Sequence, residues 1–285
     1  MKRRNYSVGK DAERLAYFIR ETSSSLPDDA ERALRLAARR EVKGSSAHMV
    51  LETVLKNVKL ARVDGTPVCQ DTGTLTFFVP ERLRRRITPS VIGKAVELAT
   101  ANGWLRRNTN DPVSGKSIDT NVCPGAPVVH YVESGDACTI RLLMKGGGSE
   151  NMSCQFSLPD AELGAGRDME GVRRAVLSAV HRAQGYGCAP GILGVCIGGD
   201  RAGGYEEAKL QLLRNLADKN PDPTLAKLET RILKEANSLG IGPMGLGGKT
   251  TLLAVKIGTR PRVPASYFVT VAYLCWAARR RSLAL

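Results

Sequence analysis

Two cysteines lie inside glycine-rich stretches, at Cys69 in residues 69–74 (CQDTGT) and at Cys188 in residues 185–191 (GYGCAPG). Glycine lets a backbone approach a ligand closely and leaves N–H groups uncovered. Such N–H groups hydrogen-bond the thiolates that hold iron–sulfur clusters. The residues therefore nominate Cys69 and Cys188 as metal ligands.

Two further glycine-rich stretches, residues 145–151 (KGGGSEN) and 245–250 (GLGGKT), could present N–H groups to an anion. The second invites comparison with a phosphate-binding loop. That motif requires a glycine at position 243, where this chain has Pro243. We therefore exclude a nucleotide-binding loop and keep Lys249 as a candidate donor to a substrate carboxylate.

The chain has seven cysteines, and no two have the spacing of a zinc ribbon. In a chain without a secretory signal, thiols and metal ligands are more typical than disulfides. Cys275 follows an apolar stretch and precedes Trp276. The residues alone do not choose it over Cys123 or Cys196 as a third ligand.

Composition and charge narrow the class of protein. The 285 residues are 42% hydrophobic and 25% charged, as in an ordinary globular protein, and the net charge is +14. The basic runs at residues 84–86 and 279–281 have little aromatic interleaving and match no nucleic-acid motif. We therefore expect an acidic substrate or partner and no nucleic acid.

The expected cellular compartment follows from the absence of membrane-spanning and secretory signals in the sequence. No apolar run reaches the ~20 residues needed to cross a membrane. The basic residues 1–6 are not followed by an apolar stretch, so we expect no secretory signal. The expected location is the cytoplasm, without membrane attachment.

The elements that must position these loops alternate between helices and strands. Helical signals occur at residues 11–20, 27–44 and 45–58, then after Thr88–Pro89 and at residues 172–183 and 225–239. Short apolar runs predict strands at residues 75–79, 126–132, 139–144, 192–197, 252–257 and 268–274. We predict an α+β fold, with a helical N-terminal region followed by mixed β-sheets flanked by helices. Residues 1–62 form the predicted helical scaffold and residues 63–285 the catalytic region.

Four ordered motifs, CQDTGT, KGGGS, GCAP and GGK, together with the C-terminal segment from residue 264 to Ala277, resemble the alpha-type domain of iron–sulfur hydro-lyases. Class I fumarases and L-tartrate dehydratases belong to that family. The resemblance covers about residues 63–281, and it implies that the whole chain forms one alpha-type domain. It also implies a cluster held in loops between subdomains.

The resemblance implies a [4Fe–4S] cluster bound by Cys69, Cys188 and Cys275, with one iron open to substrate. An open metal position can act as a Lewis acid toward the hydroxyl of a hydroxy acid. An electron-transfer cluster would have a fourth cysteine more often. The alternatives for that fourth ligand are Cys123, Cys138, Cys154 and Cys196, and we expect a structural role for each.

The resemblance also implies roles for several other residues. Gln70 and Asp71 match residues that contact the substrate, and Asp71 is the candidate catalytic proton acceptor. Arg106 matches an arginine that pairs with a substrate carboxylate, with its neighbour Arg107 as the rival. Gly147, Gly148 and Lys249 complete the candidate substrate-binding set.

A partner subunit is expected, because single-chain fumarases of the family continue into a beta-type domain and this sequence ends at Leu285. We expect a separate beta subunit that completes the site, and an alpha–alpha dimer within an α2β2 assembly. The leading hypothesis is the alpha subunit of a hydro-lyase that converts fumarate to L-malate. The alternatives are the alpha subunit of an L(+)-tartrate dehydratase and, in another class, a non-catalytic iron–sulfur redox or sensor protein.

Overall fold

The computed structural model describes residues 8–133 and 138–285, and the chain divides into two compact units. Unit 1 combines Met1–Pro27, Asn57–Gly146 and Arg279–Leu285, and unit 2 combines Asp28–Lys56 and Gly147–Ala278. The basic residues 1–6 lie outside the described residues. No helix in the described ranges is both long and apolar enough to cross a membrane.

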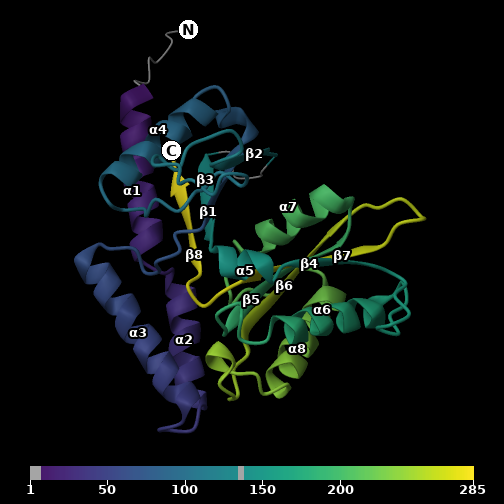
Figure 1. Cartoon of the computed structure of the whole chain (residues 1–285). Coiled ribbons are helices and arrows are strands. Elements are labelled where there is room, and N and C mark those ends of the chain that lie inside the picture. The colour runs from purple at the N-terminus through teal and green to yellow at the C-terminus, as the bar shows by residue number, and fades with distance from the viewer. Residues whose placement is uncertain (1–7, 134–137) are drawn as a thin grey trace. The chain divides into compact units, whose positions relative to one another are not determined.

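Unit 1 contains a mixed sheet in the order β2-β1-β3-β8 (Figure 1). Its strands are β1 (Thr74–Pro80), β2 (Val128–Val132), β3 (Thr139–Lys145) and β8 (Arg279–Ala284). Strand β1 is parallel to β2, and β3 is antiparallel to both β1 and β8. Leu75 and Arg279 both pair with Met144. The start of β1, the end of β3 and the start of β8 therefore lie at one end of this sheet.

Helices α1 (Val8–Ser24) and α4 (Pro89–Ala101) cover one face of the unit 1 sheet. Thr88 caps α4 by accepting the N–H of Val91, and Pro89 occupies the first turn, as predicted. A short 3₁₀ helix, η1 (Glu81–Leu83), follows β1. The core joins apolar side chains of both helices and of strands β1 and β3, including Leu15, Ile19, Phe77, Ile92, Val96 and Leu142.

Unit 2 contains a second mixed sheet, in the order β4-β7-β5-β6. Its strands are β4 (Cys154–Ser157), β5 (Gly191–Gly198), β6 (Leu252–Arg260) and β7 (Phe268–Leu274). Strand β5 is parallel to β6, and β7 is antiparallel to both β4 and β5. All eight residues of β5 are buried, because helices cover both faces of the sheet.

Helices α6 (Met169–Ala183) and α8 (Pro223–Ser238) lie on one face of this sheet and α7 (Arg201–Gln211) on the other (Figure 1). An aspartate caps each of these helices by accepting backbone N–H groups of the first turn: Asp168, Asp200 and Asp222. Unit 2 also contains α2 (Asp28–Arg40), α5 (Gly147–Asn151) and η2 (Pro243–Gly245).

The three N-terminal helices predicted from the sequence are present, but they are divided between the two units. Helix α1 belongs to unit 1, α2 belongs to unit 2, and α3 (Ser46–Asp64) crosses the division at Lys56. Ser45 caps α3 by accepting the N–H of His48 at 3.2 Å. An independent scaffold of residues 1–62 therefore stays a prediction.

The predicted α+β class with mixed sheets is confirmed, and all six predicted strands are found. Strands β4 and β8 and helix α7 were not predicted. Strand β8 begins with three arginines, which we had interpreted only as a basic run. Its backbone pairs with β3, so pairing overrides the weak strand propensity of the sequence.

Candidate functional site

Asp71 lies in the loop before β1 that also carries Cys69 and Gln70. Its Oδ1 accepts a hydrogen bond from the Nδ2 of Asn108 at 3.2 Å. The hydroxyl of Thr72 donates to the Oδ1 of Asn108 at 2.8 Å, which fixes the orientation of the amide. Asp71 is half-buried and Gln70 is exposed, so an oriented carboxylate remains within reach of a small molecule.

The backbone at Arg106 is held by Asn121, a buried residue in the left-handed conformation with φ 58°. The Nδ2 of Asn121 donates to the carbonyl oxygen of Arg106 at 2.8 Å, and its Oδ1 accepts from the N–H of Asn108 at 3.2 Å. Asn121 therefore places Arg106 and the partner of Asp71 on one fixed loop of unit 1.

The side chains of Arg106 and its rival Arg107 are both exposed, but they differ in their contacts. A nitrogen of Arg107 lies 3.7 Å from a carboxylate oxygen of Asp119. Arg106 extends from the loop that also holds Asp71 through Asn108. The choice of Arg106 over Arg107 as the residue that meets a substrate carboxylate stays a prediction.

Gly73 and Gly146 bring the two strand ends of unit 1 together. Gly73 has φ +73°, and a Cβ there would lie 2.4 Å from the carbonyl of Lys145. A Cβ at Gly146 would lie 2.8 Å from Oδ2 of Asp71 and 3.6 Å from Nη2 of Arg279. Glycine at position 146 leaves room for the ends of both side chains, and the Arg279 guanidinium lies close to Asp71. The sequence reasoning did not find Arg279.

Cys188 occupies a fixed loop of unit 2. It is exposed and has φ +55°, a conformation that non-glycine residues adopt mainly where the surroundings enforce it. A Cβ at Gly187 or at Gly191 would lie 2.4 Å from ring atoms of Tyr273. The glycines around Cys188 are therefore required by the packing of the loop on the Tyr273 ring.

Cys275 lies next to the Cys188 loop in unit 2. The N–H of Trp276 donates to the carbonyl oxygen of Cys188 at 3.3 Å, and Cys275 is buried. Burial raises the pKa of Tyr273, and the neighbouring Cys275 and Cys188 raise it further. Both thiols therefore lie close to one buried phenol.

These unit 2 residues fit an iron–sulfur group. Two thiols come from adjoining segments, and the buried Tyr273 hydroxyl has no hydrogen-bond partner in the part of the chain that the structure describes. A thiolate or sulfide sulfur can accept a hydrogen bond from such a hydroxyl. Cys69, half-buried, lies in unit 1. The structure thus brings together two of the three predicted ligands.

No group of three or more His, Cys, Asp or Glu side chains that could hold a metal ion occurs within residues 8–133 and 138–285. The other four cysteines have separate environments. Cys196 is buried in β5, and burial raises its pKa to about 12. Burial also raises the pKa of Cys154 to about 11. Cys123 and Cys138 are half-buried in unit 1.

The remaining predicted substrate-binding residues lie in unit 2. Gly147 and Gly148 begin the short helix α5 and are exposed. Lys249 is also exposed, but its backbone N–H donates to both carboxylate oxygens of Glu41, at 3.1 and 2.9 Å. A Cβ at Gly248 would lie 2.9 Å from Oε2 of Glu41. This glycine-rich loop therefore binds an internal carboxylate, a role that sequence reasoning missed.

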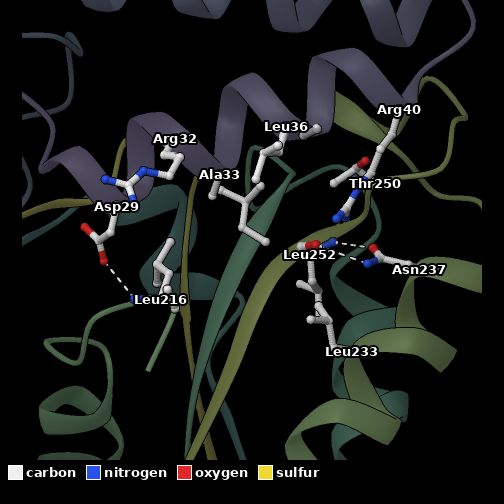
Figure 2. Close-up of a pocket in the computed structure, with 13 residues that line it drawn as sticks. Asp29, Arg32, Ala33, Leu36, Arg40, Leu216, Leu233, Asn237, Thr250 and Leu252 are labelled. Carbon is white, nitrogen blue, oxygen red and sulfur yellow. Dashed lines mark hydrogen bonds between the residues drawn. The ribbon is translucent and has the colours of Figure 1, made fainter. Parts of the chain in front are cut away.

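A groove of about 200 Å³ lies elsewhere in unit 2, between α2, α8 and β6 (Figure 2). Figure 2 shows Leu36 and Leu233 in its wall and the Asn237 side chain hydrogen-bonded to the backbone at Leu252. None of the predicted site residues lines this groove as far as it is described. It offers no thiol and is not the candidate site.

Comparison with known proteins decides the family. The family model described as fumarate hydratase (Fumerase) matches residues 12–284. This chain belongs to the fumarate hydratase family. A member named for fumarate hydratase class I, from Geobacillus stearothermophilus, is 46% identical over 274 residues, which are 94% of this chain and 53% of that protein. The chain thus spans about half the length of that relative.

Other members of the family match over most of their length. A protein of Methanocaldococcus jannaschii named for L(+)-tartrate dehydratase subunit alpha is 35% identical, over 92% of this chain and 93% of that protein. The L(+)-tartrate dehydratase subunit alpha of Escherichia coli K12 is 30% identical, over 97% of this chain and 91% of that subunit. The resemblance inferred from the motifs is therefore confirmed.

Proposed function

We propose that this chain is the alpha subunit of a two-subunit [4Fe–4S] hydro-lyase that hydrates fumarate to L-malate. The observation that carries the proposal is the loop of residues 69–73. In a member of the fumarate hydratase family, this loop joins a thiol directly to an oriented carboxylate, Asp71, beside Gly146. A carboxylate next to a Lewis acid can take part in removing the hydroxyl of a hydroxy acid.

Cys69, Cys188 and Cys275 would hold the cluster, which supplies an iron with Lewis acidity toward a hydroxyl oxygen. Asp71, oriented by Asn108, would accept or return the proton of that hydroxyl. Arg106 would pair with one substrate carboxylate, and Gln70, Gly147, Gly148 and Lys249 would supply further donors.

The proposed partner is a separate beta subunit that completes the site, in an α2β2 assembly containing an alpha–alpha dimer. Two relatives that match over more than nine-tenths of their length are named as alpha subunits, which supports this organisation. The cytoplasm remains the proposed location.

A second candidate is the alpha subunit of L(+)-tartrate dehydratase, which converts tartrate to oxaloacetate. The names and the length coverage of two relatives favour it, whereas the higher identity of the Geobacillus protein favours fumarate. L-malate and L(+)-tartrate differ by one hydroxyl group, so turnover must decide between the two activities.

The experiment is anaerobic reconstitution of the full chain with iron and sulfide, followed by turnover assays with its beta subunit on fumarate, L-malate and L(+)-tartrate. We expect turnover that requires both subunits, with fumarate and L-malate as the active pair. Cys188→Ser should abolish turnover and cluster absorbance, whereas Cys196→Ser should retain both. A stable cluster without turnover on any of the three acids would favour the redox or sensor alternative.

A further inference from the structure

Arg279 begins β8, and its side chain is fully buried in unit 1. None of its three guanidinium nitrogens has a hydrogen-bond partner among the residues that the structure describes. A guanidinium carries five N–H donors and stays protonated in proteins. An anion that accepts hydrogen bonds from these N–H groups would therefore satisfy this side chain.

The energetic cost makes a purely structural role a poor explanation. A buried charge whose donors have no hydrogen-bond partner destabilises a folded protein. Arg281, two residues further along the same strand, is only half-buried and donates from Nη2 to the carbonyl oxygen of Glu21 at 3.4 Å. The two arginines share the side of the strand that faces α1, yet only Arg279 keeps a buried charge without such a contact.

The surroundings of the guanidinium point to the candidate site. Arg279 pairs with Met144 in β3, two residues before Gly146. A Cβ at Gly146 would meet Nη2 of Arg279 at 3.6 Å and Oδ2 of Asp71 at 2.8 Å. The two side chains therefore approach the same side of Gly146, and their atoms are separated by no more than the sum of these distances.

We propose that Arg279 binds one carboxylate of the dicarboxylate substrate, beside Asp71. A carboxylate accepts two parallel N–H bonds from a guanidinium, which matches the unused donors. Gly146 is glycine, on this account, because a side chain would fill the space where the carboxylate, Asp71 and Arg279 meet. Arg106 then serves the other end of the substrate. The assignment rests on the proposed function for the identity of the acid.

Because the guanidinium has no exposed surface in this structure, a carboxylate reaches it only through a local opening of the chain. Substrate binding should therefore be slow relative to diffusion, and it should protect the start of β8 from hydrogen exchange. We expect the slow binding and the protection from hydrogen exchange in the full chain, both with and without a bound cluster.

The test compares Arg279→Gln, Arg279→Lys and the control Arg281→Gln, which removes the same charge from the same strand. L-malate binding to the full chain is measured by calorimetry and by the shift in melting temperature, before and after anaerobic reconstitution. Arg279→Gln should weaken binding about 10- to 100-fold, the loss expected for a charge-assisted pair. Arg279→Lys should retain part of the affinity, because it keeps the charge without the fork. Arg281→Gln should bind like the parent chain.

Stability separates a binding role from a structural one. Without ligand, Arg279→Gln should melt at the same temperature as the parent or higher, because a buried charge without a hydrogen-bond partner has been removed. A lower melting temperature with unchanged L-malate affinity would overturn the proposal. So would a parent chain whose melting does not respond to L-malate, or an effect of Arg279→Gln on cluster absorbance alone, which would make the cluster its partner.

The outcomes also separate this inference from the proposed function. Turnover of fumarate with normal KM in Arg279→Gln would leave the function standing and overturn the inference. Arg279-dependent binding of L-malate without turnover on any tested acid would support the carboxylate site and contradict the hydratase activity.

Discussion

At the scale of single residues, the candidate site depends on a relay of polar contacts in unit 1. Thr72 donates to Asn108, and Asn108 donates to Asp71. The side chain of Asn121 fixes the backbone of this loop by hydrogen bonds to the carbonyl oxygen of Arg106 and the N–H of Asn108. Each amide has its orientation set by a partner, so Asp71 is oriented before any ligand arrives. Preorganisation of this kind suits the proposed role of Asp71 as a proton acceptor.

Asn108→Ala should lower turnover more than it lowers substrate affinity. The variant removes the donor to Asp71 while leaving the cysteines and arginines in place. Loss of a hydrogen bond to a charged group predicts a fall in kcat of about tenfold, with KM changed by about twofold or less. Steady-state kinetics of the reconstituted chain with the proposed beta subunit measure both constants.

The control for this variant is Asn102→Ala, which removes an exposed amide contact at the end of α4. It should leave kcat and KM unchanged. Equal kcat in Asn108→Ala and the parent would show that the orientation of Asp71 does not limit the reaction.

At the scale of elements, β5 illustrates why the sheet of unit 2 has its sequence. Leu193, Val195 and Ile197 face the core formed with α6 and α8, whereas Gly194 faces α7. A Cβ at Gly194 would lie 2.0 Å from the carbonyl oxygen of Ala208. The helix can lie this close to the strand only because the strand has glycine there.

Gly194→Ala should therefore destabilise unit 2, because the added methyl group meets helix backbone that cannot move aside cheaply. We expect a loss of about 1–3 kcal/mol in the free energy of unfolding, as for overpacked cores. Urea unfolding followed by circular dichroism measures it.

Gly93→Ala in α4 is the matched control. Its Cβ would meet only Val122 Cγ1 at 3.5 Å, which is an ordinary van der Waals contact. This substitution should stabilise the chain by up to about 1 kcal/mol, because alanine favours helix. The idea of a close helix–strand contact fails if both glycine variants shift stability in the same direction.

At the scale of the whole molecule, the chain passes repeatedly between the two units. Unit 1 receives its last strand only from Arg279–Leu285, after the chain has completed unit 2. The six residues of β8 pair with β3 along its length. Unit 1 therefore depends on contacts between residues far apart in sequence, and the two units cannot be separated by a single cut.

Deletion of residues 279–285 should destabilise unit 1 specifically. Without β8, strand β3 loses one line of backbone hydrogen bonds and becomes an edge strand. Hydrogen exchange should show reduced protection in β3 and unchanged protection in β5. Arg281→Gln, which keeps the strand, should resemble the parent, and unchanged protection of β3 in the deletion variant would contradict this role of β8.

The sequence by itself determined the family, the α+β class, the six predicted strands and the set of candidate residues. These rest on local signals: apolar periodicity, caps, and motifs in which cysteine, aspartate and glycine have fixed spacing. Asp71 and Arg106 lie in one hydrogen-bonded loop system, and their roles stay predictions.

Only the tertiary structure decided the rest. The arginines of β8 look like a solvent-exposed charge run, yet backbone pairing with β3 buries Arg279 beside Gly146 and Asp71. The glycine-rich loop at Gly248 suggests a ligand site, yet Glu41, 208 positions away in sequence, accepts the N–H of Lys249 in this loop. Both outcomes depend on which distant segments meet, and no local pattern carries that information because the partners are set by packing of the whole chain.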